Sequence, residues 1–192
     1  MRMRVIAIGG ASGAGKTTLA GVLAMQLLSN GYTSKLDSFG GPIKERVRQK
    51  NDAALIDRDA DRGMMQQMGT VMRCGNKNYY VNLLFVRNNM DAFMWEHFAD
   101  KWQPADFLII DDVRYENEAK FCLQHNGLLL YMEGTHSRLS ADVAGHESEQ
   151  HGEAVKALAD RVIPFMEGYS AVMSVVDTML RTGFVFQEKK EA

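Results

Sequence analysis

Short apolar runs alternate with stretches of helical periodicity along most of the chain. Residues 5–8 form an apolar run that ends in glycines, and residues 17–28 then carry apolar side chains at helical spacing. Residues 107–111 and 127–133 are apolar enough for buried strands, and residues 161–165 form a weaker run. Strands that alternate with helices predict an α/β fold with a parallel central sheet, whose ligands bind at the carboxyl ends of the strands.

Two long segments interrupt this alternation. Residues 42–104 are rich in Met, Arg and Gln, and their helical spacing predicts a helical insertion over the edge of the sheet. Residues 134–151 are polar, and connectors of this length are often lids, whereas residues 169–180 predict a closing helix. We expect a single domain over residues 1–192. Its core would comprise residues 1–41, 105–133 and 155–185.

The segment between the first strand and the first helix, GGASGAGKTT, matches the pattern GxxxxGK[ST]. Its glycines let backbone N–H groups surround phosphate oxygens, and the following helix directs its positive end at them. Lys16 would bridge the β- and γ-phosphates of ATP, and Thr17 would bind Mg²⁺. The residues expected to bind ATP are Gly10, Ser12, Gly13, Ala14, Gly15, Lys16, Thr17 and Thr18. The motif predicts a nucleoside triphosphate site but does not distinguish kinases from other P-loop enzymes.

A magnesium site at such a loop also needs a carboxylate at the end of a neighbouring strand. The run FLIIDDVR supplies Asp111 and Asp112 at that place. One of the two should hold the metal, and the competing interpretation is a cap on the helix that follows.

A GTPase would carry a base-reading Asn-Lys-x-Asp motif after a later strand. The nearest match, NKNY at Asn76, lacks the Asp and precedes the FLIIDDVR run, so a GTPase switch is improbable. Cationic residues instead accumulate in the insertion, at the strand end and in the lid, which favours transfer to a second phosphate group. These residues are Lys44, Arg62, Arg73, Arg114 and Arg138.

Composition bears on the partners of the protein. The formal net charge of -2 gives no overall positive field for a nucleic-acid polymer, so it favours a small-molecule substrate. Cys74 and Cys122 lack metal-ligand spacing and favour a reducing, cytoplasmic setting. No apolar run approaches the roughly 20 residues of a membrane span, so we expect no membrane partner. Apolar faces on the insertion would allow a homodimer.

Four segments taken together resemble the deoxynucleoside monophosphate kinases of bacteriophages, a family within the P-loop kinase group. They are DDVRYENEA from Asp111, PIKERV from Pro42, RGMMQQMGTVMR from Arg62 and HESE from His146. The match runs in order over most of the chain. The resemblance implies the three-layer P-loop NTPase fold, with an acceptor-binding insertion and a lid. It also implies phosphorylation of a deoxynucleoside 5′-monophosphate (dNMP) to the diphosphate with ATP and Mg²⁺, in an infected bacterial host.

The resemblance further implies roles for individual residues. Lys16 would grip the donor phosphates, Thr17 and Asp112 would serve the metal, and Arg114 would lie near the phosphates. Asp112 is preferred to Asp111 because the acidic position of the family pattern directly precedes Val-Arg. The residues implied at the acceptor site are Lys44, Arg62, Gln66, Arg73, His146 and Glu149.

Two departures from the family pattern affect the acceptor site and the lid. The chain has Tyr80 where the family often has Trp, and Glu133 where the family has an Arg after the third strand. We hypothesise that Arg138 replaces this arginine as a catalytic residue of the lid.

Three other functions stay open on the sequence. The first is phosphorylation of a modified base, such as 5-hydroxymethyluracil, within phage DNA, and only this function would make DNA a partner. The second is another small-molecule phosphate kinase, for example one acting on phosphomevalonate. The third is a nucleotide-binding module without turnover, which an intact Lys16 and Asp112 make improbable. The accepted base depends on a pocket formed by distant segments, so the sequence does not identify it.

Overall fold

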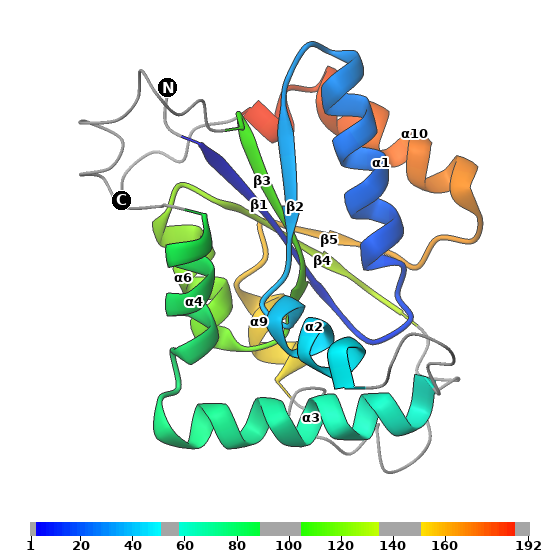
Figure 1. Cartoon of the computed structure of the whole chain (residues 1–192). Coiled ribbons are helices and arrows are strands. Elements are labelled where there is room, and N and C mark those ends of the chain that lie inside the picture. Colours follow the sequence, from blue (N-terminus) through cyan, green and yellow to red (C-terminus); the bar gives the residue numbers. More distant parts are fainter. Residues whose placement is uncertain (1–2, 51–57, 89–104, 135–150, 187–192) are drawn as a thin grey trace, which may run out of the picture.

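Five parallel strands form the central sheet of the computed structural model, which describes residues 3–50, 58–88, 105–134 and 151–186. The strands lie in the order β2-β3-β1-β4-β5, so the first strand of the chain is at the centre (Figure 1). In chain order they are β1 (Arg4–Gly10), β2 (Ser34–Asp37), β3 (Phe107–Val113), β4 (Leu128–Met132) and β5 (Arg161–Ile163). The predicted α/β fold with a parallel sheet is confirmed.

The strand β2 is the part of the sheet that the apolar pattern did not predict. Its sequence, SKLD, contains a single apolar residue, and the strand lies at the edge of the sheet with half-exposed and exposed side chains. It is in register with β3 from Ser34 opposite Phe107 to Asp37 opposite Ile110. An edge strand needs no continuous apolar run, because its faces are covered less completely than those of the central strands, and Lys35 and Leu36 of β2 are exposed.

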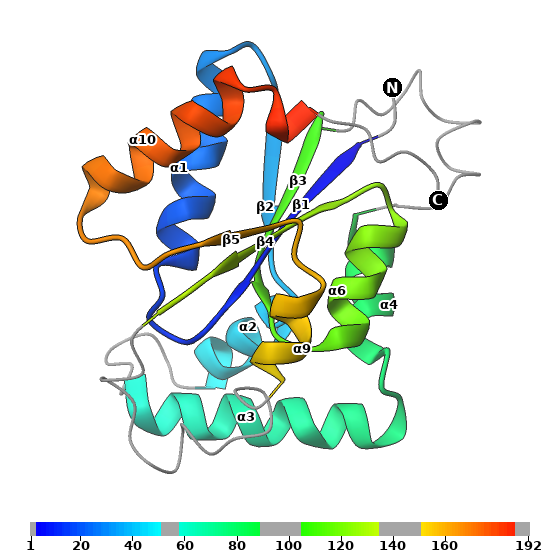
Figure 2. The same cartoon turned by 180° about the vertical axis from the view of Figure 1, so that it is seen from behind.

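Helices cover both faces of the sheet, as the alternation predicted (Figures 1 and 2). One face carries α1 (Lys16–Ser29) and α10 (Tyr169–Arg181), followed by the 3-10 turn η1 (Phe184–Phe186). The opposite face is covered by α4 (Tyr79–Arg87), α6 (Glu116–Gln124) and α9 (Gly152–Ala157). The core is therefore divided by the sheet into two apolar layers.

Side-chain alternation along β1 assigns each residue to one of these layers. Val5 and Ala7 belong to the layer under α4, α6 and α9, whereas Ile6 and Ile8 belong to the layer under α1 and α10. All four are at most 1% exposed. Full burial of an aliphatic side chain contributes about 1.5–3 kcal/mol, so the central strand fixes the position at which the phosphate loop begins.

Beyond the carboxyl ends of the strands lie α2 (Gly41–Lys50) and α3 (Arg58–Gly75), with α3 across the bottom of the view in Figure 1. These helices and α4 form the described part of the predicted insertion. The helix α4 contributes Tyr80, Val81 and Leu84 to a core layer, so this part of the insertion is built into the core rather than placed over an edge. Within the described ranges, no helix combines the length and apolar character required to cross a membrane.

Candidate active site

The phosphate loop joins β1 to α1, and its glycines adopt backbone angles that other residues rarely reach. Gly10, Gly13 and Gly15 have φ values of 135°, 79° and 92°. A Cβ atom on Gly10 would also collide with the carbonyl oxygen of Met132, because Gly10 and Met132 are paired across β1 and β4. The glycines of the motif are thus required by the conformation of the loop and by its contact with the sheet.

The side chain of Lys16 closes the loop from the first turn of α1. Its Nζ donates hydrogen bonds to the carbonyl oxygens of Gly10, at 2.8 Å, and Ala11, at 2.6 Å. Lys16 is buried and is the first residue of α1, so its positive charge and the positive end of the helix both lie at the loop. This arrangement fits the phosphate groups of a nucleoside triphosphate.

The hydroxyl of Thr17 donates a hydrogen bond to Oδ2 of Asp111 at 2.7 Å. The sequence-based pairing of Thr17 with Asp112 therefore differs from the contact in the structure. Successive side chains of a strand point to opposite faces, and Ile109 belongs to the α1 layer whereas Ile110 belongs to the other. Asp111 follows Ile109 onto the α1 face, where Thr17 lies.

Asp112 lies on the opposite face and binds the loop between β2 and α2. Its carboxylate accepts backbone N–H groups from Phe39, at 2.7 Å, and Gly40, at 2.9 Å, and Nζ of Lys44 lies 3.9 Å away. Burial raises the pKa of Asp112, although Lys44 and the N–H of Gly40 act against this shift. Asp112 thus anchors α2 to the end of β3 and brings Lys44 to the site.

A second anchored cation, Arg73 of α3, lies beside the start of α6. Arg73 of α3 donates through Nη2 to Oε1 of Glu118 at 3.0 Å. The guanidinium carbon of Arg73 also lies 4.7 Å from the ring centroid of Tyr80 and 4.0 Å from that of Tyr115, within the range of cation–π interactions. Sequence analysis identified Arg73 but missed Glu118. The available signal was an acidic residue in the first turn of the helix that follows a strand. The same signal is equally typical of a residue that caps the helix.

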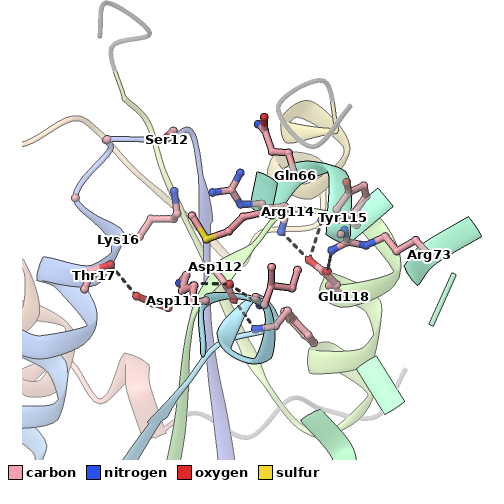
Figure 3. Close-up of a pocket in the computed structure, with 18 of the residues that line it drawn as sticks. Ser12, Lys16, Thr17, Gln66, Arg73, Asp111, Asp112, Arg114, Tyr115 and Glu118 are labelled. Carbon is pink, nitrogen blue, oxygen red and sulfur yellow. Dashed lines mark hydrogen bonds and ion pairs between the residues drawn. The ribbon is translucent and has the colours of Figure 1, made fainter. Parts of the chain in front are cut away.

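One cavity connects these groups, with a volume of about 480 Å³. Figure 3 shows Ser12, Lys16 and Thr17 on one side of it and Arg73 and Glu118 on the other. Asp111 and Asp112 lie between the two sides (Figure 3). The phosphate-binding loop therefore lies across the cavity from cations of α2, α3 and the end of β3.

Most of the predicted site residues that the structure describes line this cavity. From the loop these are Ser12, Gly13, Gly15, Lys16, Thr17 and Thr18, and from the other segments Lys44, Gln66, Arg73, Asp112 and Arg114. Gly10 and Ala14 do not line it, because Gly10 packs on Met132 and Ala14 is buried. The side chain of Arg62, together with Arg138, His146 and Glu149, lies outside the described residues.

Glu133, which stands where the resemblance leads one to expect an arginine, has a hydrogen-bond partner in the structure. Glu133 follows β4, and its Oε1 accepts a hydrogen bond from Nζ of Lys156 in α9 at 2.6 Å. Neither residue is among those that line the cavity. The acid at this position therefore joins the end of β4 to α9 rather than entering the described part of the site.

No family model matches the chain, and no curated protein is similar to it at a significant level. Among solved structures it is similar to shikimate kinase from Acinetobacter baumannii in complex with shikimate. That likeness has 16% identity and a TM-score of 0.48, and it covers 98% of this chain and 97% of that one. Shikimate kinase from Aquifex aeolicus is similar with 10% identity, a TM-score of 0.47 and coverage of 95% and 99%. A mutant of the APS kinase CysC from Mycobacterium tuberculosis has 11% identity, a TM-score of 0.42 and coverage of 94% and 98%.

Proposed function

We propose that the protein transfers the γ-phosphoryl group of ATP to a deoxynucleoside 5′-monophosphate, with ADP and the deoxynucleoside diphosphate as products. The observation that carries this proposal is the composition of the cavity. A phosphate loop forms one side, and Lys44, Arg73 and Arg114 are among the residues that line the remainder. Two anionic phosphate groups could be held against one another only if such cations offset their repulsion.

On the donor side, Lys16 and the backbone N–H groups of the loop would hold the β- and γ-phosphates. We assign the metal to Thr17 and Asp111, which are hydrogen-bonded at 2.7 Å, rather than to Thr17 and Asp112. When bound, Mg²⁺ would neutralise charge that develops on the donor phosphates. In this assignment Asp112 keeps α2 and Lys44 in place.

On the acceptor side, Arg73 and Lys44 would bind the monophosphate and Gln66 would contribute a polar contact. Arg114, which lines the cavity, would stabilise charge on the group in transfer. A phosphate monoester has its second pKa at about 6, so its attacking oxygen needs no general base at neutral pH. The residues therefore act by aligning the two phosphates and by excluding water from the space between them.

The experiment that tests the function is magnesium-ATP turnover against a panel of acceptors. The panel contains the four dNMPs, modified dNMPs and DNA that carries 5-hydroxymethyluracil, and Lys16→Ala controls for a contaminating kinase. We expect diphosphate from at least one dNMP and none with Lys16→Ala. Transfer of the γ-phosphoryl group only to the DNA would contradict the proposal and indicate a kinase of DNA bases. Hydrolysis of ATP without transfer to any acceptor would contradict a kinase function altogether.

A further inference from the structure

Glu118 is 1% exposed, yet its carboxylate forms part of the cavity lining. Its Oε1 accepts from Nη2 of Arg73 at 3.0 Å. Its Oε2 accepts from the backbone N–H groups of Arg114, at 2.9 Å, and Tyr115, at 3.1 Å. One carboxylate thus joins α3 to the turn between β3 and α6, and it contacts two arginines that line the same cavity.

The contacts of Glu118 differ in what they require chemically. The backbone N–H groups at the start of α6 need only an acceptor, which a neutral amide oxygen would also supply. The contact with Arg73 uses the charge of the carboxylate, because a charge-assisted hydrogen bond is shorter and stronger than a neutral one. A buried ion pair is weak evidence for stability, since its desolvation cost can exceed its Coulombic gain. The charge of Glu118 is therefore better explained by the placement of Arg73.

The side chain of Arg73 would be poorly ordered without contacts that hold it. Its side chain is 21% exposed and extends from α3, a helix that lies beyond the sheet rather than on it (Figure 1). An arginine at such a place has many rotamers, and ordering them at the moment of binding weakens affinity. Glu118 and the rings of Tyr80 and Tyr115 select one arrangement beforehand.

We propose that Glu118 is a positioning residue, which holds the guanidinium of Arg73 at the side of the cavity opposite Lys16 so that it meets the phosphate of the acceptor. The inference rests on the proposed function, since it takes the acceptor to be a phosphate monoester. Glu118 also fixes the backbone of Arg114 at the same point. Among the described residues, its hydrogen bonds go to Arg73, Arg114 and Tyr115 and not to the donor loop.

The test is the variant Glu118→Gln, assayed at pH 8. Glutamine keeps the size of the side chain and one oxygen that can accept hydrogen bonds from the backbone N–H groups. Its amide nitrogen, however, cannot accept the hydrogen bond from Arg73. We expect the KM for the dNMP to rise about tenfold, because a charge-assisted contact is lost, while the KM for ATP stays unchanged. Equal increases in both KM values would show a general structural role and overturn the proposal.

Glu116→Gln is the matched control. Glu116 lies in the same first turn of α6, but its side chain is 50% exposed and paired with Lys120 at 2.6 Å. The variant removes one negative charge from the same helix end without altering the cavity lining. We expect both KM values to equal those of the unmodified protein, and an increase in the dNMP KM like that of Glu118→Gln would contradict a specific role for Glu118.

A double-mutant cycle with Arg73→Ala tests whether Glu118 acts through Arg73. If it does, Glu118→Gln raises the dNMP KM in the unmodified protein but adds nothing in the Arg73→Ala background. Effects that multiply would show that Glu118 acts independently of Arg73 and would overturn the proposal.

Failure of the proposed function can be separated from failure of this inference. If the unmodified protein phosphorylates no dNMP, inorganic phosphate becomes the probe. Its binding is followed by thermal unfolding of protein saturated with Mg²⁺ and the non-hydrolysable analogue AMP-PNP, which fills the donor loop. Weaker phosphate binding in Glu118→Gln than in Glu116→Gln supports the positioning role. Equal binding in both variants, or no binding to the unmodified protein, overturns it.

Discussion

At the scale of single residues, the site depends on two adjacent aspartates with different tasks. Asp111 accepts a hydrogen bond from the hydroxyl of Thr17. Asp112 accepts hydrogen bonds from two backbone N–H groups of the loop before α2. The pleat of β3 directs the two side chains to opposite faces, so neither can take over the contacts of the other.

The first prediction separates these two tasks. Asp111→Asn should weaken the affinity for Mg²⁺ about 10- to 100-fold, because it changes a group at the metal site. Asp112→Asn should leave the Mg²⁺ requirement unchanged and lower stability, since it alters the anchor of α2. Turnover measured over a range of Mg²⁺ concentrations, with urea unfolding of both variants, distinguishes them. A change in Mg²⁺ affinity for Asp112→Asn alone would return the metal role to Asp112.

The second prediction concerns the proton on Glu118. The pKa of this carboxyl is raised from its ordinary value of 4.5 to about 7. Burial is the main cause and the charge of Asp112 adds to it, whereas Arg73 and the N–H of Arg114 act against the shift. The folded protein therefore holds the proton more tightly than the unfolded chain does. The stability that this provides is present in full below about pH 4.5 and is lost as the pH rises through about 7.

The predicted loss is about 3 kcal/mol of unfolding free energy between pH 4.5 and 7.5. Urea unfolding at a series of pH values should show that this component is absent from Glu118→Gln and kept in Glu116→Gln. Parallel pH profiles for Glu118→Gln and the unmodified protein would contradict a raised pKa. At pH 8, the pH chosen for the kinetic test, Glu118 is mostly ionised and able to pair with Arg73.

At the scale of elements, the phosphate loop is shaped by the strands beside it as well as by its own sequence. Gly10 is the last residue of β1 and pairs with Met132, the last residue of β4. The missing side chain of Gly10 lets the two strands stay in register up to the point at which the loop begins. The loop is therefore positioned by the sheet before any nucleotide binds.

The third prediction compares two glycines with positive φ. Gly31 has φ of 83° and no atom within 4 Å of an added Cβ, so Gly31→Ala should cost only its backbone strain, about 1 kcal/mol. Gly10→Ala adds the collision with the Met132 carbonyl and should cost about 3 kcal/mol or more. Equal costs for the two variants in urea unfolding would show that the contact with β4 is unimportant.

At the scale of the whole molecule, the cavity collects segments that are far apart in the chain. Its lining includes Thr17 of α1, Lys44 of α2, Arg73 of α3, Asp111 of β3 and Glu118 of α6. Parallel strands bring their carboxyl ends to one edge of the sheet, and α2 and α3 lie beyond that edge (Figure 2). A donor and an acceptor would thus be bound by different elements within one space.

The fourth prediction uses a ligand that occupies both halves of this space. An adenosine joined to a deoxynucleoside through five phosphates should bind about 100-fold more tightly than ATP, because the second half binds at high effective concentration. Calorimetry should show that Arg73→Ala loses most of this advantage. Arg181→Ala, which removes an exposed arginine paired with Asp177 on α10, should retain it. The same affinity for both ligands would indicate that donor and acceptor do not share the cavity.

Features of this protein that depend on local pattern could be predicted from its sequence. Apolar runs predicted β1, β3 and β4 to within a few residues, and the glycines and Lys-Thr pair predicted the phosphate loop, because strand burial and turn conformation are encoded in neighbouring residues. The cations Lys44, Arg73 and Arg114 and the amide of Gln66 belong to segments that the sequence analysis assigned to the site. The contacts that hold each of these side chains were not visible in the sequence.

Three other features became visible only once the elements were packed together. It added β2, whose edge position requires no apolar run, and it directed Asp111 rather than Asp112 to Thr17. It also joined Arg73 to Glu118, two residues 45 positions apart in the chain. A local pattern shows that a strand or helix forms, whereas the partner of a side chain depends on how separate elements pack, and that packing places the charges of this site.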